Sequence, residues 1–110
     1  MNSTKEKRLN RAGWVAGDTS EFLQLTKEES RFLDLKLGLA HGVRELRERK
    51  GLTQAALADR LGSSQSRVAK MEAADRSVSV DLMMRSLLTI GATTREIAGW
   101  IKRGDTSRAA

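Results

Sequence analysis

Polar side chains that can donate or accept hydrogen bonds gather within six consecutive residues of the chain. They are Gln65, Ser66, Arg67 and Lys70. A glutamine amide donates and accepts at once, which matches the edge of adenine, whereas arginine and lysine donate to the acceptors of guanine. Short serine side chains allow close approach and reach phosphates or base edges. These residues therefore favour recognition of a nucleic acid over bond-making chemistry.

Residue types that make and break bonds are scarce. The chain has no cysteine, no tyrosine and one histidine, His41. The usual nucleophile–base pairs are missing, and disulfides and thiolate metal sites are excluded. We expect a protein that is not an enzyme, with no catalytic residues, no metal site and no cofactor. We interpret His41 as a helix-surface residue.

The charge balance is basic. The chain has 20 lysines and arginines against 14 acidic residues, a formal charge of +6, which favours a polyanionic partner. No apolar run approaches the roughly 18 residues of a membrane span, and the N-terminus lacks the apolar segment of a signal peptide. We expect a cytoplasmic protein with no membrane partner, associated with the nucleoid when it is bound to DNA.

Composition predicts an all-α fold, because proline is absent, β-branched runs are missing, and leucine, alanine, arginine and glutamate dominate. Capping residues and glycines then set the element boundaries. The predicted helices cover residues 27–50, 54–61, 65–74, 80–90 and about 94–103. A capping box, Thr26 with Glu29, begins the first helix, and Gly38 or Gly42 is where it breaks if it breaks at all. The predicted N-caps are Thr53, Ser64 and Ser79, and the predicted terminating glycines are Gly51, Gly62 and Gly91.

The first helix is predicted to carry a wide apolar face. One stripe, expected to point inward, comprises Phe32, Leu35, Leu39, Val43 and Leu46. A second stripe of Leu33, Leu37 and Ala40 either packs under the segment 14–25 or forms a subunit interface. Charged residues follow, namely Arg44, Arg47, Arg49 and Lys50 with Glu45 and Glu48. We interpret most of this run as a solvated face with local ion pairs.

The helices 54–61 and 65–74 are predicted to cross closely. Ala58 is small where the first helix crosses the second, and Gly62 can take the positive φ of a tight turn. The shared core would consist of Leu57, Leu61, Val68 and Met71. With these residues inside, the polar side chains of the second helix point outward, as in a helix-turn-helix whose second helix enters the major groove. The free amides at Thr53 and Gln54 suit a phosphate.

Residues from about 41 to 102 resemble the Cro-type, or XRE, helix-turn-helix family. The resemblance rests on the stretches Arg44–Gln54, Leu57–Gly62 and Ser64–Glu72. It implies a five-helix, lambda-repressor-like domain with a recognition helix at residues 65–74. It also implies phosphate contacts from Gln54 and binding as a two-fold dimer to a palindrome. Ser63 departs from the family pattern, since many relatives place an apolar residue there.

We accordingly predict three parts: an N-terminal extension at 1–25, a helix-turn-helix domain at 26–103 and a flexible tail at 104–110. The predicted function is a sequence-specific repressor that autoregulates its operon as a homodimer on double-stranded DNA. Arg76 is added because it follows the recognition helix in a loop, where family members often meet the DNA backbone. The predicted DNA-binding residues are Thr53, Gln54, Ser63, Ser64, Gln65, Ser66, Arg67, Lys70 and Arg76.

The N-terminal part leaves alternatives open. Arg11–Trp14 and Glu21–Glu29 resemble antitoxins of the HigA type, which implies a small ribonuclease toxin as a second partner. The basic segment Lys5–Arg11 is either an arm that reaches DNA or a solvated terminus. Short helices are predicted at 4–11 and 18–25. A non-DNA interaction module that retains the fold is the remaining alternative.

Overall fold

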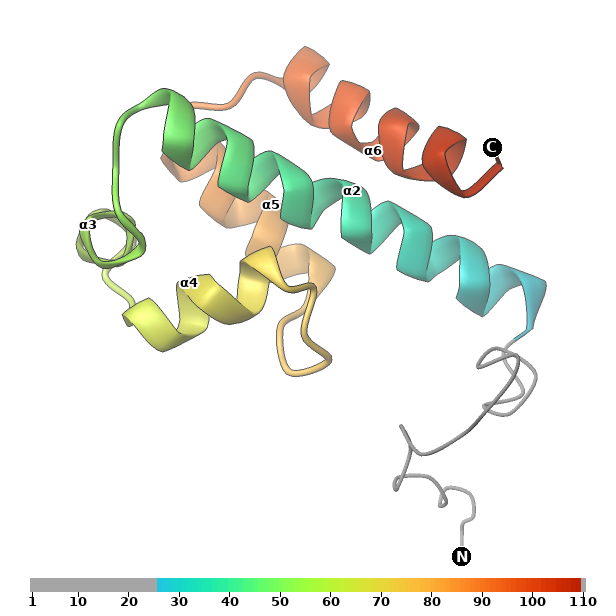
Figure 1. Ribbon diagram of the computed structural model, residues 1–110, viewed down its shortest axis with the longest axis horizontal. Coiled ribbons are helices and arrows are strands. Elements are labelled where there is room, and N and C mark those ends of the chain that lie inside the picture. The colour runs from blue at the N-terminus through green and yellow to red at the C-terminus, as the bar shows by residue number, and fades with distance from the viewer. Residues whose placement is uncertain (1–25, 110) are drawn as a thin grey trace, which may run out of the picture. The chain divides into compact units, whose positions relative to one another are not determined.

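The computed structural model describes residues 26–109, and within this range it contains five helices and no strand. The helices are α2 (Lys27–Arg49), α3 (Gln54–Leu61), α4 (Gln65–Glu72), α5 (Val80–Thr89) and α6 (Thr94–Ala109) (Figure 1). The predicted all-α class is confirmed. The helices predicted at 4–11 and 18–25 lie outside the described residues. No helix in the described range is long and apolar enough to cross a membrane.

The chain divides into two compact units, residues 1–32 and 33–110. The described part of the first unit is the start of α2. Here the capping box forms in both directions: the Thr26 amide donates to Glu29 Oε1 at 2.9 Å, and the Glu29 amide donates to Thr26 Oγ1 at 3.0 Å. The predicted start of this helix is therefore confirmed.

The other helix ends in residues 33–109 also follow local chemistry. Thr53, Ser64 and Ser79 accept the amides of Ala56, Arg67 and Leu82 at 3.0, 3.1 and 3.0 Å. Gly51, Gly62 and Gly91 take positive φ angles, as predicted for helix-terminating residues. The end of α4 differs from the prediction: the helix ends at Glu72 rather than at residue 74, because Ala74 already has a φ of +53° and cannot continue a right-handed helix.

The core of the unit 33–110 draws on all five helices. Its most deeply buried large side chains are Leu39, Val43, Leu46, Leu57, Val68, Met71, Met83 and Leu87, and Trp100 of α6 is 2% exposed. Three residues of the predicted inward stripe on α2, Leu39, Val43 and Leu46, belong to this core. The wide apolar face of α2 is thus covered mainly along its second half.

The first half of α2 corrects two predictions. Leu35, expected to point inward, is 37% exposed, and Phe32, the first residue of the same stripe, is 51% exposed. Among the described residues, burial of apolar side chains on α2 begins only at Leu39. The hydrophobic core contacts the second half of this helix and not its first half. The second stripe is divided as well: Leu33 and Leu37 are exposed, whereas Ala40 is buried.

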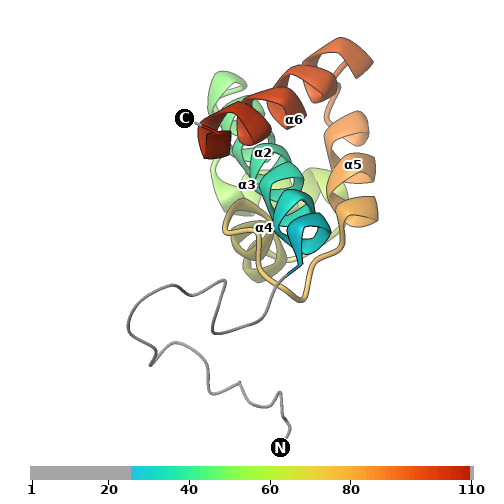
Figure 2. The same cartoon turned by 90° about the vertical axis from the view of Figure 1, so that its right-hand side faces the viewer.

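Helices α2 and α6 lie side by side (Figures 1 and 2) and approach closely at glycines. A Cβ atom on Gly38 would collide with the Trp100 carbonyl, and one on Gly42 would lie 2.5 Å from the Trp100 ring. The α2 glycines therefore admit a neighbouring helix, and α2 shows no break at either position. Gly104 of α6 approaches the Asp34 carbonyl in the same way. Helix α6 continues to Ala109, past the predicted end at 103.

Candidate nucleic-acid interface

The α3–turn–α4 unit is built as the spacing predicted. Leu57, Val68 and Met71 are completely buried, and Ala58 is 4% exposed. The turn is closed by Gly62, with a φ of +64°, and by the Ser63 amide, which donates to the Ala58 carbonyl at 2.8 Å. Ser63 thus makes its turn contact through its backbone, and its polar side chain does not disturb the turn.

The outward side of α4 carries the predicted polar residues. Gln65, Ser66, Arg67 and Lys70 are all exposed, as expected when Val68 and Met71 point inward. At about 100° per residue, positions 65, 66, 69 and 70 share one face of the helix. Ala69 belongs to this face and was not among the predicted residues, because its side chain is apolar; helical spacing alone would have found it. Its small side chain leaves room for close approach.

Arg67 lies apart from that face. It is about 200° around the helix from Gln65, and it lines a groove of about 270 Å³ between the α3–α4 turn and α5. Leu82 and Arg85 of α5 line the same groove. The structure thus places Arg67 at the edge of the outward surface, beside this groove.

A partly buried ion pair supports α4 from behind. Arg47 Nε lies 2.5 Å from Glu72 Oε2, and Arg47 Nη2 donates to Glu72 Oε1 at 3.0 Å. The two side chains are 13% and 7% exposed. Arg47 Nη1 also donates to the Leu52 carbonyl at 2.9 Å, so one guanidinium links α2, the entry to α3 and α4. The hydrogen bond to Glu72 is the largest cause that raises the pKa of Arg47 above its ordinary value.

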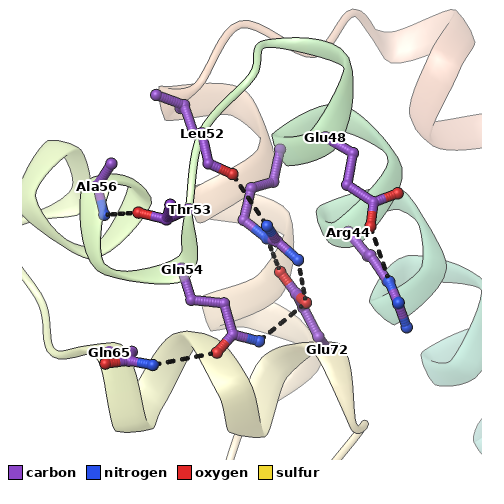
Figure 3. A network of polar contacts seen from close by, with 9 residues as sticks. Arg44, Glu48, Leu52, Thr53, Gln54, Ala56, Gln65 and Glu72 are labelled. Atoms are coloured by element: carbon purple, nitrogen blue, oxygen red, sulfur yellow. Dashed lines mark hydrogen bonds and ion pairs between the residues drawn. The ribbon is translucent and has the colours of Figure 1, made fainter.

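The same carboxylate orients two glutamines (Figure 3). Gln54 Nε2 donates to Glu72 Oε1 at 3.1 Å, and Gln65 Nε2 donates to Gln54 Oε1 at 3.5 Å. Because a carboxylate only accepts, the Gln54 amide nitrogen must face Glu72 and its oxygen must face Gln65. The chain of contacts therefore sets which way the first side chain of α4 presents its amide.

The sequence pattern predicted that the charged run 44–50 is mostly a solvated face, and Arg47 is the exception within it. Arg44 does form the predicted type of local pair, with Glu48 at 3.2 Å on the surface. Arg47 instead turns inward to a partner 25 residues away. Glu72 was singled out only as part of the family motif. A glutamate that is removed from solvent needs a cationic partner. This requirement could have pointed from Glu72 to an arginine such as Arg47.

The remaining predicted residues surround this centre. Thr53 and Ser64 are exposed N-cap residues whose oxygens accept backbone amides, which leaves their hydroxyl hydrogens available to an acceptor. Ser63 is half-buried in the turn. Arg76 is exposed in the loop after α4, and no ion pair of its side chain is found within residues 26–109. Within that range, no group of three metal-binding side chains occurs.

Two closely packed helices, a left-handed glycine turn and an outward polar face on the second helix define a DNA-binding helix-turn-helix. Residues 43–94 match the model of the Helix-turn-helix family. This segment is a helix-turn-helix domain of the Cro type, which supports a DNA-binding transcription regulator. No match was found among curated proteins or among solved structures. The narrower HigA resemblance stays a prediction.

Proposed function

We propose that the protein is a repressor that reads a specific operator through the exposed face of α4. The observation that supports this most strongly is the chain of contacts from Arg47 through Glu72 and Gln54 to Gln65. An amide held in one orientation distinguishes donor from acceptor on a base edge, whereas a freely rotating amide does not. Such preorganisation is of use for sequence reading and is not needed for non-specific coating of DNA.

In this proposal the base contacts come from one face of α4. Gln65 pairs with an adenine and Lys70 with a guanine acceptor. The short side chains of Ser66 and Ala69 lie on the same face and allow α4 to approach the bases closely. The exposed positions of all but the half-buried Ala69 agree with this assignment.

Phosphate contacts come from the rim. We assign them to the start of α3, at Thr53 and Gln54, where free amides and the helix dipole favour an anion. The remaining phosphate contacts are assigned to Ser63, Ser64, Arg67 and Arg76. These contacts fix the register of α4 on the duplex and make the affinity depend strongly on salt.

We further propose that the protein binds as a homodimer to a palindrome in the promoter of its own operon. One recognition helix with four or so reading positions distinguishes too few base pairs to find a single genomic site. A two-fold dimer doubles the recognised sequence and places the half-sites about one helical turn apart.

The test is selection of bound duplexes from a randomised pool by the purified wild-type chain. We expect enrichment of a symmetric sequence with two half-sites about 10 base pairs apart, centre to centre. Arg95→Ala serves as the control variant, because Arg95 is exposed on α6 and lies outside the matched segment. It should select the same sequence as the wild-type chain. If no sequence is enriched, the proposed repressor function is contradicted. If an asymmetric sequence is enriched, the proposed two-fold dimer is contradicted.

A second function is favoured by the exposed leucines at the start of α2. Leu33 is 41% and Leu37 is 54% exposed, and in the chain they follow the N-terminal segment that resembles antitoxins. We propose that this surface helps to bind and neutralise a small ribonuclease toxin. The test is binding to the product of a toxin-sized neighbouring reading frame, with Leu37→Glu expected to weaken it. A genome without such a neighbour counts against this function.

A further inference from the structure

Lys36 of α2 is a lysine in an unusual place. It is only 6% exposed, and its Nζ donates to the backbone carbonyl of Asp75 at 2.9 Å. Burying an ammonium group is costly unless it is paired. The contact joins α2 to the loop between α4 and α5, residues 73–79, across 39 positions of sequence. Lys36 also lies before the segment 43–94 that matches the family.

The loop that Lys36 contacts is held tightly around one residue. The Asp75 amide donates to the Lys70 carbonyl at 2.9 Å, and the Asp75 carbonyl also accepts the Val78 amide at 3.1 Å. The Asp75 carboxylate accepts the amide and the hydroxyl of Ser77 at 2.9 and 2.5 Å. Arg76 is the residue between them, and it is exposed.

The electrostatics agree with this geometry. The hydrogen bonds from Ser77 are the largest cause that lowers the pKa of the Asp75 carboxyl, and the charges of Lys70 and Lys36 lower it further. The ammonium of Lys36 thus lies close enough to act on the side chain of Asp75 as well as on its carbonyl. A cation at this position also suits the C-terminal end of α4.

We propose that Lys36 is a positioning residue for DNA binding: through Asp75 it holds the loop so that Arg76 points at a backbone phosphate. The proposal rests on the proposed function and extends it, because it assigns part of the DNA contact to a side chain outside the matched segment. Without Lys36, the loop retains the Val78–Asp75 hydrogen bond and the Ser77 contacts. The loop then keeps its fold but loses its attachment to α2.

The experiment uses the full chain and a duplex selected by the wild-type protein. Affinity is measured by fluorescence anisotropy over a series of salt concentrations for Lys36→Met, Arg76→Ala and the double variant. Methionine keeps an apolar stem of similar length and removes the ammonium. Lys50→Met is the control, since Lys50 is an exposed lysine close to the end of the same helix.

We expect Lys36→Met to weaken binding about three- to ten-fold. The magnitude of the salt slope should fall by about 0.9 for each phosphate that the protein no longer neutralises. Arg76→Ala should lower the slope equally, and the double variant should be no weaker than Arg76→Ala alone. Lys36→Arg, which keeps a cation, should restore most of the affinity. Backbone ¹⁵N relaxation should show faster local motion of residues 74–78 in Lys36→Met.

Three results overturn the proposal. One is additive losses in the double variant, which make Lys36 and Arg76 independent. Another is a loss of affinity in Lys36→Met at an unchanged salt slope, which marks a general loss of stability. The third is an Arg76→Ala variant that binds as the wild type does, because Lys36 then has no phosphate-binding residue to position. Failure of the wild-type chain to select any duplex would instead overturn the proposed function itself.

Discussion

Arg47 of α2 and Glu72 of α4 make two contacts with each other, one to each carboxylate oxygen, and both side chains lie largely out of solvent. The pair connects the helix that precedes the matched turn to the helix proposed to read DNA. It also supplies the acceptor that orients Gln54. In our proposal, stability and DNA reading therefore depend on the same Glu72 carboxylate, and substitutions can separate the two roles.

Breaking this pair on one side should destabilise the protein strongly. Arg47→Met leaves the Glu72 carboxylate buried without its cation, and the expected loss in the free energy of unfolding is about 3–5 kcal/mol. Urea denaturation followed by circular dichroism measures this loss. Arg44→Met, which breaks the exposed pair with Glu48, is the control and should cost less than about 1 kcal/mol.

Replacing both partners should recover stability without recovering binding. In Arg47→Met/Glu72→Met no charge is left buried, and apolar replacements of buried ion pairs are often neutral or stabilising. Gln54 nevertheless loses its acceptor, so Gln65 is no longer oriented. We expect near-wild-type unfolding midpoints with DNA affinity reduced by about ten-fold, a factor that corresponds to one charge-assisted hydrogen bond. A double variant with both properties restored would contradict the role assigned to Glu72.

Local chemistry explains what the sequence could predict. A cap such as Ser64 needs only an amide three residues away, and Gly62 needs only its own backbone freedom, so the α3–α4 unit followed from short spacings. The Arg47–Glu72 pair depends on how α2 packs against α4. The six charged residues between positions 44 and 50 do not reveal which arginine turns inward.

The role of the glycines within α2 could not be predicted from the sequence for a related reason. Gly38 and Gly42 were predicted as the places where the helix breaks if it breaks at all, because a glycine in isolation weakens a helix. In the structure each one is a point of close approach between α2 and α6. The missing side chain allows the neighbouring helix to pack closely. The sequence periodicity of a single helix does not show that such a neighbour is present.

The α2–α6 crossing yields a matched pair of substitutions. Gly38→Ala places a methyl group against the Trp100 carbonyl, a backbone atom that cannot rotate away, so we expect destabilisation of about 1–3 kcal/mol. Gly99→Ala on α6 meets nothing within 4 Å and should stabilise the helix by about 0.5–1 kcal/mol. Thermal unfolding of both variants checks the contrast. Equal effects of the two substitutions would contradict the close crossing.

The start of α6 should make stability depend on acid. The Thr93 amide, followed by Arg49, lowers the pKa of Glu96 below its ordinary value of 4.5. A carboxyl with a lowered folded-state pKa stabilises the fold above its unfolded pKa, and this stabilisation is lost as pH falls through the folded value. The difference in unfolding free energy between the wild type and Glu96→Gln should therefore be constant near pH 7 and shrink below about pH 4.5. Glu45→Gln is the control, since Glu45 has only a surface pair at 3.7 Å.

The repressor proposal depends most on an oriented Gln65 that reads a base. Its sharpest test is the affinity of the wild-type chain and of Gln65→Ala for the selected duplex and for every single-base-pair variant of it. We predict that Gln65→Ala abolishes discrimination at one base pair in each half-site, worth about 1–3 kcal/mol, and leaves discrimination at the other positions intact. A uniform loss of affinity at all positions, or an unchanged profile, would contradict this role of Gln65.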